Sequence, residues 1–169
     1  MRNPKLGFIL IIFIIFSACI DSTPSFNGIW LSEVDSLFLD NGDFDATLGN
    51  VKENDSLPIL FRGIYSIIGN SIYFTYTYVH GEFLKYIWKE GGVWERFGIK
   101  SKWYSENELK AVLKDFFLED NIVSEEEFER IWGYTSPTMF PTRKAFISGN
   151  SFTLIDEGVE TITYTRSQN

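Results

Sequence analysis

The stretch FRGIYSIIGNSIYFTYTYV, residues 61–79, decides the fold of this chain. It contains two strand-like runs, Phe61–Ile68 and Ser71–Val79, joined by the turn pair Gly69-Asn70. Runs of this kind on either side of a short turn predict an antiparallel β-hairpin. Alternation along the second run places a largely aromatic face on one side of its strand, made of Ile72, Phe74, Tyr76 and Tyr78. The hairpin is therefore expected to present an apolar face to a core.

Short strand-like runs continue on both sides of this hairpin. A strong turn signal, Asn41-Gly42, joins Ser36–Asp40 to Asp43–Leu48, because both turn residues tolerate a positive φ. The other expected strands are Gly28–Val34, Phe83–Glu90, Val93–Lys100, Lys144–Ser148, Ser151–Asp156 and Val159–Arg166. Even spacing of roughly nine or ten short strands is typical of an antiparallel sandwich or barrel, so an all-β, mainly antiparallel fold is expected.

Residues 105–132 break the strand pattern and predict a helical hairpin inserted between two strands. Ser105 with Glu108, and Ser124 with Glu127, form capping boxes that mark two helix starts. Apolar residues then recur at helical spacing: Leu109, Val112, Leu113, Phe116 and Phe117, then Phe128, Ile131 and Trp132. These stripes are expected to pack on the domain's own sheet, and the alternatives are covering a barrel mouth or binding another protein. Residues 134–141 are expected to lead the chain back to the sheet.

Composition narrows the function classes. The chain has 169 residues, a formal net charge of −8 and 17% aromatic residues, which suits a single domain with a large core. An acidic protein repels phosphate backbones, so no nucleic-acid partner is expected. Cys19 and His80 are the only residues of their types, and neither has the partners of a metal site or a catalytic triad, so no enzymatic activity, cofactor or metal is expected. The acidic turn from Asp40 to Asp45 is interpreted as a hairpin rather than a Ca²⁺ loop.

The N-terminus has the pattern of a secretory signal. Arg2 and Lys5 precede an almost purely apolar run, Leu6–Phe16, which ends in small residues before Cys19. Counted to Ile20, the apolar stretch has 15 residues, whereas a membrane-spanning helix needs about 20. A cleaved signal is therefore expected, and an uncleaved membrane anchor is the alternative.

Ser17-Ala18-Cys19 resembles the lipobox of bacterial lipoproteins. The resemblance implies cleavage before Cys19 and attachment of acyl chains, such as palmitate, to its thiol and new amino group. It divides the chain into a signal peptide (1–18), an acylated tether (19–26) and a folded domain (27–169) held at the bacterial cell envelope. In two-membrane bacteria an aspartate directly after the cysteine tends to retain the protein at the inner membrane. Ile20 stands there, so the outer membrane is expected.

Gly28-Ile29-Trp30 at the start of the first strand and Tyr164-Thr165-Arg166 at the end of the last resemble the lipocalin superfamily. The resemblance implies a β-barrel in which Trp30 lies across the closed end, Arg166 packs over it and Gly28 allows their close approach. A closed barrel makes its first and last strands neighbours, so this pairing is geometrically consistent. A β-sandwich is the alternative.

The aromatic side chains suggest what a barrel could do. Five of them could line a ligand cavity: Tyr65, Phe74, Tyr76, Tyr78 and Trp88. A barrel of about eight strands either fills with side chains or holds one small ligand. The first hypothesis is therefore capture of a small apolar or amphipathic molecule. The second is a filled barrel that acts as a structural or protein-interaction module, with an unknown protein partner.

Overall fold

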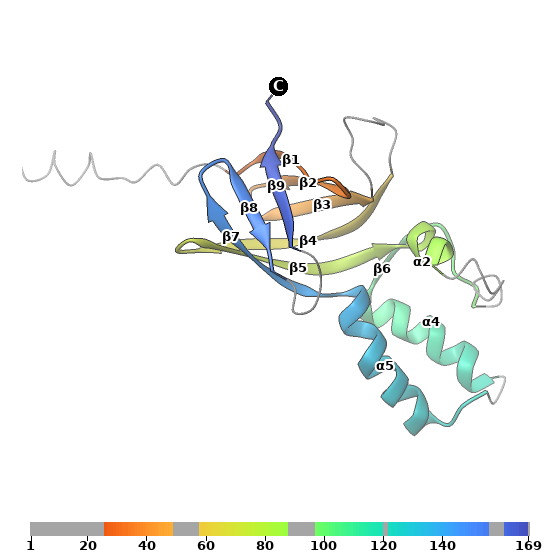
Figure 1. Ribbon diagram of the computed structural model, residues 1–169. Helices are drawn as coiled ribbons and strands as arrows, with labels where there is room; N and C mark the ends of the chain where they lie inside the picture. The colour runs from red at the N-terminus through yellow and green to blue at the C-terminus, as the bar shows by residue number, and fades with distance from the viewer. Residues whose placement is uncertain (1–25, 49–57, 88–96, 120–121, 156–160, 169) are drawn as a thin grey trace, which may run out of the picture.

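The computed structural model describes residues 26–48, 58–87, 97–119, 122–155 and 161–168 (Figure 1). Its strands are β1 (Gly28–Leu31), β2 (Asp35–Asp40), β3 (Asp43–Leu48), β4 (Ile59–Ile68), β5 (Ser71–His80), β6 (Trp103–Ser105), β7 (Thr142–Ser148), β8 (Ser151–Leu154) and β9 (Ile162–Arg166). Its helices are α2 (Gly81–Ile87), α4 (Glu106–Glu119) and α5 (Glu125–Met139). The predicted signal peptide and the tether up to residue 25, including Cys19, lie outside the described residues.

Eight antiparallel strands close into a barrel. Taken along the chain, β1, β2, β3, β4, β5, β7, β8 and β9 each pair with the next, and β9 pairs back to β1. Neighbours in sequence are thus neighbours in space, which is the up-and-down arrangement. The short strand β6 is added at the end of β5, from Tyr78 to His80. The predicted fold class, a mainly antiparallel barrel with an inserted helical hairpin, is confirmed.

The tight turns between barrel strands gather at one end of the barrel, which we call the turn end. Asn41-Gly42, Gly69-Asn70 and Gly149-Asn150 join β2 to β3, β4 to β5 and β7 to β8 there. Asn41 and Gly42 have φ values of 49° and 98°, as expected for a two-residue hairpin. Because the strands alternate in direction, the connections β1–β2, β3–β4, β5–β7 and β8–β9 lie at the opposite end, which we call the loop end.

The β5–β7 connection, residues 81–141, is called the insert. It contains α2, β6 and the helical hairpin α4–α5, which projects from the loop end beside the barrel (Figure 1). The first capping box forms in both directions: the Glu108 carboxylate accepts from the Ser105 N–H at 2.9 Å, and the Ser105 hydroxyl accepts from the Glu108 N–H at 3.4 Å. In α5 the Ser124 hydroxyl accepts from the Glu127 N–H at 3.2 Å. Both helix starts were predicted correctly.

Two strands predicted inside the insert are wrong over residues 83–87 and 97–100, the parts of them that the structure describes. The segment expected as the strand Phe83–Glu90 begins with the helix α2, in which Leu84 is fully buried. A short apolar run fits a strand and a helix equally well, and the burial of Leu84 in the insert favours the helix. Of the expected strand Val93–Lys100, the described residues 97–100 form a turn around Gly98, with a φ of 65°, followed by irregular chain.

The second helix is longer than predicted. It was expected to end near Trp132, yet α5 continues through Pro137 to Met139. Ser136 and Met139 are both buried, so they extend the inward face of the helix by another turn. Packing of this face outweighs the helix-breaking tendency of the proline.

Two apolar cores result. The barrel core is formed by inward side chains of the strands, including Trp30, Phe74 and Phe152. The insert core combines the helical stripes with Leu84 and with residues at the ends of β5 and β6. Phe61 packs against both cores, 5.6 Å from the Tyr76 ring and 4.5 Å from the Phe83 ring. The helices therefore contact the sheet at its β5–β6 extension, and their stripes pack largely within the insert.

Candidate functional site

Trp30 closes the turn end of the barrel from inside. Its side chain is only 2% exposed, and its ring nitrogen donates to the Phe26 carbonyl at 2.8 Å. The indole stacks on the Phe26 ring at 5.7 Å and lies 4.9 Å from the Phe152 ring. Phe26, the first described residue, is thus already part of the barrel core.

Arg166 reaches Trp30 from the last strand. The two residues are register partners between β1 and β9, and the guanidinium carbon lies 6.0 Å from the centroid of the indole. The Arg166 Nη2 also donates to the Asn27 carbonyl. Gly28 has a φ of 133°, and a Cβ at this position would lie 3.4 Å from the Arg166 Nε. The structure thus brings Gly28, Trp30 and Arg166 together at the turn end.

The barrel interior is filled with aromatic rings. The Phe74 ring lies 5.4 Å from Phe44 and 5.5 Å from Phe152, and the Tyr76 ring lies 4.9 Å from Phe44. All four side chains are buried. Tyr65 is partly buried beside them, 6.3 Å from Phe74. Three of the residues predicted to line a cavity, Tyr65, Phe74 and Tyr76, therefore belong to the barrel core and pack with other side chains.

Tyr78 does not join this group. The register between β4 and β5 shifts at Thr77, where a β-bulge interrupts the alternation of faces. Beyond the bulge Tyr78 is 43% exposed, and Val79 is fully buried. Trp88 lies outside the described residues. The aromatic face predicted for residues 72–78 is thus right up to Tyr76 and wrong at Tyr78.

Polar side chains occupy the loop end of the interior. The Asp35 carboxylate accepts hydrogen bonds from the Tyr164 hydroxyl at 2.7 Å and the Ser32 hydroxyl at 2.6 Å. The Arg143 guanidinium carbon lies 5.6 Å from the Tyr76 ring. Burial, together with the neighbouring Asp35 charge, raises the pKa of Tyr164 far above its ordinary value. The Tyr164 hydroxyl therefore stays protonated and can serve as a donor to Asp35.

The sequence patterns did not identify Asp35, Arg143 or Gly63 as residues of the barrel interior. Asp35 is followed at a spacing of two by the inward residues Leu37 and Leu39. Arg143 is followed in the same way by Ala145 and Ile147. A charged residue in phase with an inward stripe was the signal that could have identified them. Gly63 stands in the inward stripe of β4, and a Cβ there would lie 2.4 Å from the Phe44 ring. A glycine within a strand indicates such close approaches.

A pocket of about 470 Å³ opens outside the barrel, where β6 and β7 separate along β5. β7 pairs with residues 71–75 of β5, and β6 pairs with residues 78–80. Between these pairings, the Tyr76 N–H donates to the Pro141 carbonyl at 3.1 Å. The pocket is lined by Thr75, Tyr76, Thr77, Tyr78, Ser105, Glu106, Asn107, Phe140 and Thr142. Tyr76 and Tyr78, both predicted as cavity residues, thus contribute to a surface pocket.

Asp40 and His80 are each the last residue of a strand, and both make hydrogen bonds there. The Asp40 carboxylate accepts hydrogen bonds from the side-chain amides of Asn27 at 3.3 Å and Asn41 at 2.9 Å. Asp40 and Asn41 belong to the hairpin that was predicted there. The His80 Nδ1 accepts from the Glu82 N–H at 3.3 Å. Within the described ranges, no three His, Cys, Asp or Glu side chains are grouped so that they could hold a metal ion.

Among the described segments, none of the helices has both the length and the apolar character needed to cross a membrane. Comparisons with protein-family models, curated proteins and solved structures find no match to this chain. Its function is therefore argued from the barrel, the insert and the N-terminal sequence.

Proposed function

We propose that this chain is a lipid-anchored cell-envelope protein whose filled barrel presents the insert to a protein partner. The observation that carries the proposal is the packed interior. Phe44, Phe74 and Phe152 pack on one another inside the barrel, and a barrel of this size either fills with side chains or holds one small ligand. A barrel filled in this way is a rigid scaffold, and the segments that connect its strands are the natural place for binding.

The anchor and the insert belong to opposite ends of the barrel. Phe26 packs beside Trp30 at the turn end, seven residues after Cys19. The insert leaves from the loop end (Figure 1). An acyl anchor at Cys19 would therefore hold the turn end near the membrane and leave the insert accessible on the far side.

The anchor is tested with Cys19→Ala in the full chain. We expect this variant to leave the membrane fraction after a high-salt wash, whereas the control Ser22→Ala stays with the membrane. The measurement is immunodetection in both fractions, with metabolic labelling by a palmitate analogue. Retention of Cys19→Ala in the washed membrane would contradict lipid anchoring and support an uncleaved hydrophobic anchor.

Presentation of the insert is tested with a photo-crosslinking residue at Tyr134, which is 76% exposed on α5. We expect adducts with a single protein of the envelope in intact cells. A matched probe at Thr163, exposed on β9, should give none. Equal adduct patterns from both positions would contradict a partner site on the insert.

Binding of a small amphipathic molecule is the second candidate function, and the pocket between β6 and β7 favours it. Its lining combines serine and threonine residues with Tyr78 and Phe140, which suits a ligand with polar and apolar parts. Native mass spectrometry of the acylated protein tests this candidate. A bound mass beyond the acyl chains that disappears in Tyr78→Ala, and persists in Tyr134→Ala, would support it over the filled-barrel function.

A further inference from the structure

Charge divides the barrel into two halves. The five strands β4, β5, β7, β8 and β9 are consecutive around the barrel and contain no aspartate or glutamate, although the chain carries a net charge of −8. The same strands contain four cations: Arg62, Arg143, Lys144 and Arg166. The neighbouring strands β2 and β3 contain four aspartates and no lysine or arginine. The strands on one half of the barrel thus lack the negative charge that repels anionic surfaces.

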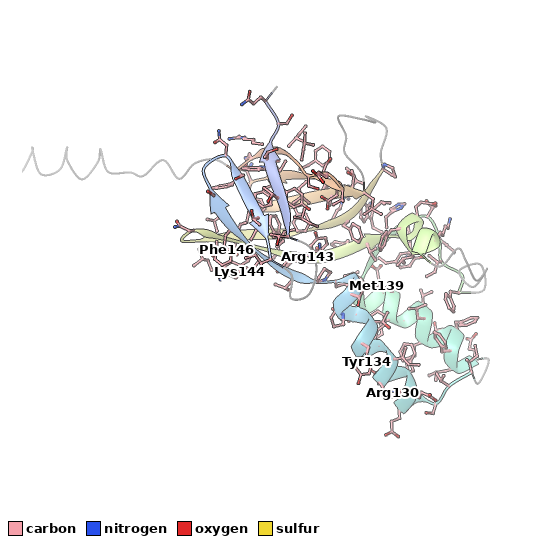
Figure 2. The ribbon with its side chains drawn as sticks, viewed as in Figure 1. Arg130, Tyr134, Met139, Arg143, Lys144 and Phe146 are labelled. Carbon is pink, nitrogen blue, oxygen red and sulfur yellow. The ribbon has the colours of Figure 1, made fainter. Side chains whose placement is uncertain are left out.

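The outer face of β4, β5 and β7, which we call the wall, also exposes apolar side chains. Ile64, Ile68 and Phe146 are 53%, 67% and 44% exposed. Ile68 and Phe146 belong to the same cross-strand row, on either side of one β5 residue, and this row is next to the turn end. Lys144 lies 4.7 Å from the Phe146 ring and 5.6 Å from the Tyr73 ring (Figure 2). Isoleucine, aromatic rings and a lysine with an apolar stem suit the boundary between lipid headgroups and acyl chains.

We propose that the turn-end half of this wall rests on the bilayer leaflet that holds the acyl anchor. This inference depends on the lipid anchoring proposed above and adds the surface that contacts the lipid. From Cys19 to Phe26 the chain has seven residue steps, which span about 25 Å at most when fully extended. The turn end therefore cannot move far from the leaflet. Lys144 on this half of the wall matches the phosphate headgroups. The insert leaves from the opposite end of the barrel (Figure 1).

The test measures the depth of fluorescent labels on the acylated full chain in vesicles of equimolar phosphatidylethanolamine and phosphatidylglycerol. A bimane label is placed at Ser66→Cys, an exposed position between Ile64 and Ile68. Matched labels are placed at Phe38→Cys, on the strand opposite β7 in the barrel, and at Glu126→Cys on α5. We expect lipids with a spin label near the headgroup to quench the Ser66 label several-fold more strongly than either control.

A second variant separates contact from simple proximity. Lys144→Glu combined with Phe146→Ser should reduce quenching at Ser66 to the level of the controls, while the protein still floats with the vesicles. Equal quenching at all three positions of a floating protein would overturn the wall contact and leave the anchor intact. Protection of the Ser66 label from aqueous iodide without lipid quenching would assign the wall to another protein surface instead. Failure of the acylated protein to float would overturn the anchoring, and the wall contact with it.

Discussion

The two ends of the barrel differ in how they are built. At the turn end, two-residue turns join the strands, and Trp30 is sandwiched among Phe26, Phe152 and Arg166. At the loop end, the buried Tyr164 donates a hydrogen bond to the half-buried Asp35, and the insert has its own core. The packing at the turn end therefore constrains which side chains can stand there. The connections at the loop end can change without disturbing the packing at the turn end. New binding functions are therefore expected at the loop end.

The largest effect is expected from Trp30→Ala. Removing a buried indole should lower the free energy of unfolding by about 3–5 kcal/mol, because a large cavity forms between Phe26 and Phe152. Urea unfolding followed by near-ultraviolet circular dichroism measures this loss. The control Trp103→Ala removes a partly exposed indole from β6 and should cost less. Equal losses in the two variants would mean that the turn end is not the densest part of the barrel.

The second prediction concerns the insert core. Trp132 is 6% exposed and stacks on Phe128, so Trp132→Ala should lower the local stability of α4 and α5 by about 3–5 kcal/mol. Hydrogen exchange should accelerate in these helices and stay unchanged in β8 and β9, since the insert core contains residues of β5 and β6 and none of β8 or β9. Tyr134→Ala, an exposed change on the same helix, is the control. Faster exchange throughout the barrel would show that the two cores unfold as one unit.

Much of the turn end could be predicted from the sequence because its determinants are local. Asn41-Gly42 and Gly149-Asn150 mark turns within a few residues of the strands that they join. The expectation that Gly28, Trp30 and Arg166 lie together came from the resemblance to lipocalins. Closure of a barrel, which makes its first and last strands neighbours, is consistent with it.

The loop end could be predicted only in part, because its structure depends on contacts distant in sequence. The bulge that exposes Tyr78 follows from pairing with β4, and strict alternation cannot locate it. The helix α2 and the last turns of α5 depend on burial in the insert core. Asp35 and Tyr164 are 129 residues apart, so their hydrogen bond could not be derived from local patterns.

The third prediction tests the polar pair at the loop end. Tyr164→Phe should destabilise the barrel by about 1.5–3 kcal/mol near neutral pH, because the Asp35 carboxylate loses a hydrogen-bond donor. The pKa of Tyr164 is raised in the folded state, so the stability that it contributes is present below the unfolded value of about 10 and is lost as the pH rises above it. Wild type should therefore lose more stability above that pH than Tyr164→Phe does. The measurement is the urea midpoint of unfolding across this pH range, and Tyr134→Phe is the control. An equal loss of stability with pH in all three proteins would contradict the Asp35–Tyr164 hydrogen bond.

The smallest effect is expected where Arg166 meets Trp30. Arg166→Ala should cost about 0.5–2 kcal/mol, since the guanidinium lies at the limit of a cation–π contact and is exposed. A double-mutant cycle with Trp30→Ala isolates the contact, because the cost of the cavity cancels between the two sides of the cycle. Arg166→Lys sharpens the result: it keeps the charge, but a lysine cannot reproduce the planar guanidinium or its hydrogen bond to the Asn27 carbonyl. We expect a measurable coupling for Arg166→Ala and only partial recovery in Arg166→Lys. Additive costs would mean that Arg166 contributes only through its hydrogen bond to the Asn27 carbonyl. Packing at the turn end would then depend on Trp30 and its aromatic neighbours.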